Sequence, residues 1–144
     1  MLRVGGIMDE NILGYLTEYF QMNDFFTNFY EIIFTDKRII ILNSGQTFRA
    51  WITRADVAYN KRQKLFNMNI EDIYNSFEDK EIESIYYKDI EEIALSRRTF
   101  MKNGKIDIKL KDGNKTYYTT KKLDIFEFEK ILKINDIPVN TKIN

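Results

Sequence analysis

The pattern of apolar and polar positions predicts a β-hairpin near residue 36. Residues 29–34 and 38–42 are runs of β-branched and aromatic side chains, and the polar segment 35–37 (TDK) separates them. Such side chains favour strands, and a short polar segment between two strands is typical of a tight turn. Because almost every position in both runs is apolar, we expect both faces of the hairpin to be buried. The expected core residues are Ile32, Ile33, Phe34, Ile39, Ile40 and Ile41.

Three further strand-like runs are shorter. One covers residues 47–52, after a turn that we expect at residues 43–45 (NSG), and the others cover residues 82–87 and 92–97. Each run contains β-branched or aromatic residues and is bounded by polar ones, which is typical of short strands.

Residues 105–111 alternate strictly between charged and apolar side chains. A period of two predicts a strand with one buried face. Asn-Gly at 103–104 and Asp-Gly at 112–113 suit tight turns on either side of this strand, and residues 117–120 supply its partner.

Helical spacing appears between the strands, over residues 53–78. A capping pattern at 53–56 (TRAD) predicts a polar helix that ends near residue 66, and Asn69 is placed to cap a second, short helix. The second helix would carry one apolar stripe. That stripe consists of Ile70, Ile73, Tyr74 and Phe77.

A final helix is predicted over residues 124–135. Asp124 caps it, Glu127 completes the capping box, and Pro138 prevents its continuation. Its apolar face must be buried against the sheet. That face consists of Ile125, Phe128, Ile131 and Leu132.

The segment 9–20 fits either a helix or a strand. Ile12, Leu16 and Tyr19 fall at helical spacing, which favours the helix, whereas the aromatic residues of the segment also suit a strand. With either choice, the elements predict a mainly β protein of the α+β class, folded as a single domain over residues 1–144. We expect an antiparallel barrel or sandwich of about seven strands. The helical insertion would lie between strands, and the C-terminal helix would cap the core.

Three motifs occur in this order along the strand-rich part of the chain. They are YEIIFTDKRII at 30–40, IYYKDIEEI at 85–93 and IDIKLKDGNK at 106–115. The first resembles the Leu-Thr-Asp-Lys-Arg-Leu-Ile hairpin of bacterial and archaeal PH-like domains, relatives of the GRAM domain, with Phe34 in place of the usual Leu. The second is similar to that family's Ile-Pro-Tyr-x-Asp-Ile-x-x-Ile strand and turn, and the third is similar to its last hairpin.

The resemblance extends from about residue 29 to residue 133 and includes the helical insertion and the closing helix. It implies a PH-like fold of two curved sheets and a capping helix. Members of this family often have no known ligand, and the resemblance carries no catalytic residues to this chain.

The composition limits the chemistry. The chain has no His and no Cys, so the commonest general base, the thiolate nucleophile and the commonest transition-metal ligands are missing. It also has no Gly-rich phosphate-binding loop. We therefore predict a protein that is not an enzyme and has no cofactor and no metal site. No apolar run reaches the roughly 20 residues that span a membrane, which predicts a cytoplasmic location.

The charges cancel overall but not locally. The 22 basic and 22 acidic residues give no global attraction to nucleic acid or anionic lipid. Residues 97–122 contain nine basic and two acidic side chains, a local net charge of +7. Residues 71–92 contain nine acidic and two basic side chains, a local net charge of −7. We expect a molecule with its charges separated toward opposite ends.

The basic segment begins with a candidate site at a predicted hairpin tip. Its cations could hold an anionic headgroup while two apolar side chains enter a membrane interface. The alternative is a solvated hairpin whose charges prevent aggregation, and the usual behaviour of charge runs favours this alternative. The candidate residues are Arg97, Arg98, Phe100, Met101, Lys102 and Lys105.

Three weaker candidates lie elsewhere. A basic cluster at 61–64 is more typical of a solvent-facing helix than of a phosphate site. Tyr117 and Tyr118, beside lysines, could stack the bases of a single-stranded nucleic acid, but the zero net charge disfavours this role. Trp51 could border a groove that accepts a peptide strand, or it could fill the core as large aromatics more often do.

These observations favour a non-catalytic binding module. A protein partner is the preferred interpretation, for an adaptor or scaffold of PH-like fold. Peripheral binding to an anionic membrane through the tip around Phe100 is the first alternative, and single-stranded nucleic-acid binding is the second.

Overall fold

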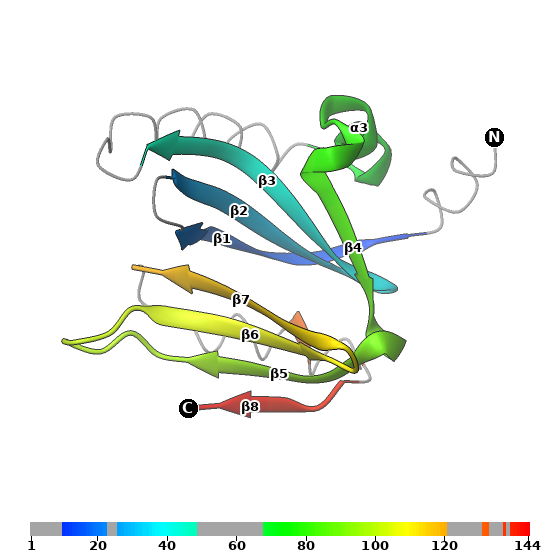
Figure 1. Ribbon diagram of the computed structural model, residues 1–144. Helices are drawn as coiled ribbons and strands as arrows, with labels where there is room; N and C mark the ends of the chain where they lie inside the picture. The colour runs from blue at the N-terminus through cyan, green and yellow to red at the C-terminus, as the bar shows by residue number, and fades with distance from the viewer. Residues whose placement is uncertain (1–9, 23–25, 49–67, 121–130, 133–136, 138) are drawn as a thin grey trace.

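The computed structural model describes residues 10–22, 26–48, 68–120, 131–132, 137 and 139–144 (Figure 1). These residues form an eight-stranded sheet with the strand order β4-β3-β2-β1-β7-β6-β5-β8. The short helix α3, Ile70–Ser76, follows β3 in the chain. The mainly β prediction is therefore confirmed.

The sheet has two halves. The first half contains β1 Ile12–Met22, β2 Phe26–Thr35, β3 Arg38–Phe48 and β4 Ile82–Tyr86. The second half contains β5 Ile90–Ser96, β6 Gly104–Leu110, β7 Gly113–Thr119 and β8 Thr141–Ile143. Two short 3-10 helices, η2 Asp79–Glu81 and η3 Tyr87–Asp89, precede and follow β4. The strands predicted at 82–87, 92–97 and 105–111 are present as β4, β5 and β6, with slightly different bounds.

The two halves meet where β1 lies beside β7 (Figure 1). Phe20 pairs with Tyr118 there, and Gln21 Nε2 donates a hydrogen bond to the Thr116 carbonyl at 2.9 Å. The strand order ends at β4 on one side and at β8 on the other, so the sheet is not closed. Because β8 runs parallel to β5, the sheet is mixed. The prediction of about seven strands that are all antiparallel is wrong in this respect.

The β2–β3 hairpin is buried on both faces, as predicted. Ile32 and Ile39 belong to an inner core that both halves of the sheet share, whereas Ile33 and Ile40 belong to an outer cluster beneath α3. This division follows from the period of two, which points successive side chains to opposite faces. The predicted core residues Ile32, Ile33, Phe34, Ile39, Ile40 and Ile41 are all at most 2% exposed.

Helix α3 covers the outer cluster and begins at the predicted cap. Asn69 Oδ1 accepts a hydrogen bond from the Asp72 N–H at 2.8 Å, and Asp72 Oδ2 accepts one from the Asn69 N–H at 3.1 Å. Ile70, Ile73 and Phe77 are buried on the face of the helix that packs on the sheet. The helix predicted over 53–66 lies outside the described residues.

The helical interpretation of residues 9–20 is wrong, because residues 12–20 of this segment belong to β1. A β-bulge lies between Leu16, which pairs with Ile32, and Tyr19, which pairs with Tyr30. The extra residue lets Leu16 and Tyr19 both face the inner core, although they are three positions apart. A bulged strand therefore reproduced the spacing of a helix.

The predicted turn at 43–45 is also wrong, because β3 continues through it. Asn43 pairs with Tyr30 and Gly45 with Phe29, so Ser44 is the extra residue of a second bulge. Asn43 Oδ1 accepts a hydrogen bond from the Gly45 N–H at 3.1 Å, which is turn chemistry within a strand. The strand predicted at 47–52 is the end of β3 as far as residue 48, and the remainder lies outside the described residues.

Most of the helix predicted over 124–135 lies outside the described residues. Its residues Ile131 and Leu132 are described, and both are 3% exposed within the inner core. Ile131 packs directly over Gly14 of β1, where an added Cβ would lie 2.4 Å from the Ile131 Cγ1. These two side chains of the predicted apolar face are therefore buried against the sheet.

Candidate functional site

The connection between β5 and β6, residues 97–103, extends beyond the ends of the neighbouring strands (Figure 1). Two hydrogen bonds close its tip. The Thr99 N–H donates to the Lys102 carbonyl at 2.9 Å, and the Lys102 N–H donates to Thr99 Oγ1 at 3.1 Å. Phe100 and Met101 are consequently the two central residues of a defined turn. We call residues 97–105 the β5–β6 tip.

The two apolar side chains of the β5–β6 tip face solvent. Phe100 is 100% exposed and Met101 is 83% exposed. The other large exposed apolar side chains of the described residues, such as Tyr118 at 40%, are much more covered. Contiguous apolar surface marks an interaction site more often than scattered apolar side chains do. This pair is therefore the strongest indication of a docking surface.

Two contacts fix the base of the β5–β6 tip. Arg98 Nη1 donates a hydrogen bond to the Thr120 carbonyl at 2.7 Å, which ties the loop to the end of β7. Gly104 begins β6 in a narrow space, where an added Cβ would lie 3.2 Å from the Ser96 carbonyl oxygen. The absence of a side chain at Gly104 permits this close approach.

Two open depressions flank the turn. One, of about 550 Å³, is lined by Arg98, Phe100, Met101 and Lys102, among others. The other, of about 650 Å³, is lined by Arg97, Lys102 and Lys105, among others. Since Lys102 borders both, the structure brings all six residues of the predicted site together.

The larger depression also contains residues that the sequence analysis did not assign to this site. Tyr118 and Asn144 line it together with Ser96. Tyr118 lies there because it pairs with Lys105 across the β6–β7 hairpin. The turn lies at residues 111–112, one residue before the Asp-Gly turn that the sequence predicted at 112–113, so the sequence pattern did not give the register that places Tyr118 opposite Lys105. Tyr117, its neighbour, is 3% exposed in the inner core and cannot stack a base as proposed.

The predicted separation of charge is only partly present. Lys109 Nζ lies 3.0 Å from Glu92 Oε1, and Lys115 Nζ lies 2.6 Å from Glu83 Oε2. Both ion pairs join the basic segment 97–122 to the acidic segment 71–92. The folded sheet therefore neutralises part of each segment.

Part of the positive charge that is not neutralised lies at the β5–β6 tip. Arg97 and Lys102 form no ion pair with any residue that the structure describes. Lys105 Nζ lies 3.5 Å from Asp107 Oδ2, and Lys105 is 41% exposed in its side chain, so that attraction is screened by water. The other candidates, Trp51 and the basic cluster at 61–64, lie outside the described residues.

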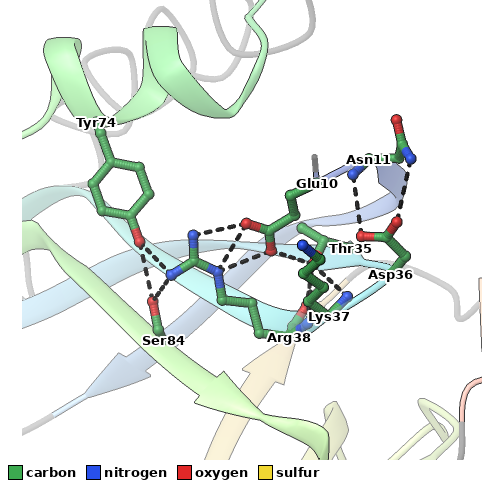
Figure 2. Close-up of polar contacts among 8 residues, drawn as sticks. All are labelled: Glu10, Asn11, Thr35, Asp36, Lys37, Arg38, Tyr74 and Ser84. Carbon is green, nitrogen blue, oxygen red and sulfur yellow. Dashed lines mark hydrogen bonds and ion pairs between the residues drawn. The ribbon is translucent and has the colours of Figure 1, made fainter. Parts of the chain in front are cut away.

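A second polar cluster is buried beside α3 (Figure 2). Arg38 Nη2 lies 2.8 Å from Glu10 Oε1, and Arg38 Nε lies 2.9 Å from Glu10 Oε2. Arg38 Nη1 donates to Tyr74 Oη at 2.7 Å and to Ser84 Oγ at 2.9 Å, while Thr35 Oγ1 donates to Glu10 Oε2 at 2.6 Å. This Glu10–Arg38 cluster joins the start of β1 to β3, α3 and β4.

The Glu10–Arg38 cluster is suited to holding elements together. The side chains of Glu10 and Arg38 are 2% and 10% exposed, and each uses its polar atoms on the other or on its neighbours. Burial by itself would lower the pKa of the Arg38 guanidinium, but the hydrogen bond to Glu10 and nearby charges outweigh burial and raise this pKa. Arg38 therefore stays charged, and its charge is matched inside the protein. No sequence pattern predicts this pair.

No protein-family model, curated protein or solved structure matches this chain. Among the residues that the structure describes, no group of three or more Asp and Glu side chains is placed to hold a metal ion. Nor is any helix of those residues both long and apolar enough to pass through a bilayer. Indications of function therefore come from the β5–β6 tip itself.

Proposed function

We propose that this chain is a non-catalytic binding module that docks on anionic membrane surfaces through the β5–β6 tip. The observation that carries the proposal is the pair of projecting apolar side chains, Phe100 and Met101, directly beside side chains of positive charge. Each basic residue close to an anionic membrane contributes about 1 kcal/mol. The cations of the tip are Arg97, Arg98, Lys102 and Lys105.

The geometry changes the preference for a protein partner that the sequence favoured. A lipid interface has anionic headgroups outside and apolar chains within, and peripheral proteins enter it by roughly 5–10 Å. A turn with apolar side chains at its end and cations at its base matches that order of layers. A protein partner at the same tip would instead have to supply an apolar pocket with acidic groups around it.

A PH-like fold is part of the proposal. The order of the elements supports it, because β1–β4 and β5–β7 are two successive antiparallel series and Ile131 and Leu132 pack between the halves. The eighth strand, β8, adds to that arrangement. A cytoplasmic location, at the inner face of a membrane, remains the prediction from the sequence.

Co-sedimentation with vesicles tests the proposed function. We expect the protein to bind vesicles that contain phosphatidylglycerol, to bind pure phosphatidylcholine vesicles much less, and to be released at high salt because ions screen the attraction. No binding to anionic vesicles at low salt would remove the membrane proposal and favour a protein partner.

Matched variants test whether the β5–β6 tip is the surface that contacts the membrane. Replacing Phe100 and Met101 with Ser should reduce vesicle binding by at least about tenfold, because two apolar side chains no longer enter the interface. The control is Tyr86→Ser, which removes an aromatic side chain that is 46% exposed on β4. Equal losses in the two proteins would show that the tip is not the docking surface.

A further inference from the structure

The larger depression at the β5–β6 tip has the composition of an anion site. It has a volume of about 650 Å³, within the usual range for small-molecule sites, and no Asp or Glu lines it. Three cationic side chains do, Arg97, Lys102 and Lys105. Tyr118 forms one wall, and its ring is supported by Phe20, with 6.3 Å between the ring centroids.

The net charge of this depression indicates the charge of its ligand. Arg97 and Lys102 have no acidic partner among the described residues, whereas Lys105 shares its charge with Asp107 at 3.5 Å. Asp107 is held in place because it accepts a hydrogen bond from Thr116 Oγ1. The depression therefore presents about two side-chain positive charges that no described acidic side chain pairs with, and the Arg97 N–H donates to the main-chain oxygen of Asn144 at 3.4 Å. A phosphomonoester carries about −1.5 to −2 at neutral pH, whereas a phosphodiester carries a single negative charge.

The polar groups around the cations also suit a phosphate. An arginine fork can hold two phosphate oxygens at once, and a lysine adds a compact charge beside it. Ser96, Asn103 and Asn144 line the same depression and offer hydrogen bonds to a further oxygen or to a neighbouring hydroxyl group. Asn144 is fixed there because its N–H donates to the Leu95 carbonyl at 2.7 Å.

We propose that this depression binds a phosphomonoester group and prefers it to a phosphodiester. The inference rests on the proposed function for one point only, that the group would be presented by a membrane lipid such as phosphatidic acid. A soluble phosphate ester has the same chemistry and would occupy the site in the same way. The neighbouring turn with Phe100 and Met101 lies outside this depression and does not line it.

Soluble probes test the site without a membrane. Glycerol 3-phosphate is titrated into the isotope-labelled protein, with dimethyl phosphate as the diester, and amide chemical shifts are recorded. We expect changes at residues 96–105, 118 and 144, and an affinity about tenfold higher for the monoester. The monoester should also bind more tightly at about pH 7.5 than at pH 5.5, because its second proton leaves near pH 6 and the chain has no His. Equal affinities, or shifts spread over all surface lysines, would overturn the inference.

Variants distinguish binding in the depression from a general attraction between the anion and the positive charges of the protein. Arg97→Gln with Lys102→Gln should lower the affinity for glycerol 3-phosphate by at least about tenfold. The matched control, Lys80→Gln with Lys88→Gln, removes the same charge at 3-10 helices η2 and η3, which directly precede β4 and β5. If both pairs weaken binding equally, the depression is not the site.

Vesicles distinguish failure of the site from failure of the proposed function. At equal total charge, vesicles with phosphatidic acid should bind more tightly than vesicles with phosphatidylglycerol. If the protein binds both kinds of vesicle equally and does not bind glycerol 3-phosphate, the phosphomonoester site is wrong and the membrane function stands. If the protein binds glycerol 3-phosphate but no vesicles, the phosphomonoester site stands and the membrane function is wrong. The protein with both Phe100→Ser and Met101→Ser should no longer bind vesicles but should still bind glycerol 3-phosphate.

Discussion

Replacing Glu10 with Gln is expected to destabilise the protein by about 3 kcal/mol. The change keeps the shape of the side chain but removes the negative charge that the Arg38 guanidinium contacts at 2.8 to 3.2 Å. Removing one partner of a buried ion pair costs about 3–5 kcal/mol. We take the lower end because Gln still accepts hydrogen bonds and because Arg38 keeps its bonds to Tyr74 and Ser84.

Urea unfolding followed by circular dichroism measures this effect. With a slope near 2 kcal/mol per molar urea, the midpoint should fall by about 1.5 M. The control is Asp36→Asn, which alters an exposed carboxylate that accepts hydrogen bonds from Asn11 at 3.1 and 3.2 Å. It should change the free energy of unfolding by less than about 1 kcal/mol.

A double variant makes the reasoning refutable. Glu10→Met combined with Arg38→Met should destabilise the protein less than either single change, because no buried charge is left without its partner. If Glu10→Gln behaves like Asp36→Asn, or if the double variant is the least stable of the set, the Glu10–Arg38 cluster does not hold these elements together.

Three other changes test the packing. Ile73→Ala removes a fully buried side chain beneath α3 and should cost about 2–5 kcal/mol in urea unfolding; a loss below 1 kcal/mol would mean that α3 does not pack there. Gly14→Ala places a Cβ 2.4 Å from Ile131 and should cost about 1–3 kcal/mol, seen as a lower melting temperature. Burial raises the pKa of Tyr87 and of Tyr117 above the ordinary 10.0, so the unfolded chain loses these protons first. The free energy of unfolding should therefore be insensitive to these groups below about pH 10 and fall above it, and an unchanged value at pH 11 would contradict their burial.

Local patterns predicted the elements whose interactions are local. The β2–β3 hairpin followed from two apolar runs around residues 35–37, and the cap of α3 followed from Asn69 and Asp72. Each depends on residues only a few positions apart. The two errors in β1 and β3 have a common cause, because a bulge adds one residue and breaks the period of two.

Contacts between distant parts of the chain could not be predicted in the same way. Glu10 and Arg38 are 28 residues apart and meet only because β1 pairs with β2 and β2 with β3. The pairing of β8 with β5 is a contact of the same kind. No feature of residues 141–143 in the sequence indicates a strand.

The candidate site could be predicted in part. Its six residues could be predicted because one continuous segment, residues 97–105, carries them all, and strands with clear patterns form or flank this segment. Tyr118 comes from β7 and Asn144 directly follows β8, and only the registers of β6–β7 and β5–β8 place them beside Arg97. The sequence therefore indicated the cationic side chains of the site, and the fold adds the Tyr118 ring and the Asn144 amide to them.

The most direct test of the docking surface uses the fact that the chain has no Cys. A single cysteine introduced as Met101→Cys carries an environment-sensitive nitrobenzoxadiazole label, and a second protein carries the same label at Lys88→Cys, near the other end of β5. On addition of phosphatidylglycerol vesicles, fluorescence at position 101 should rise and shift to the blue, with no change at position 88. An unchanged label at position 101, or equal responses at both positions, would contradict docking through the β5–β6 tip.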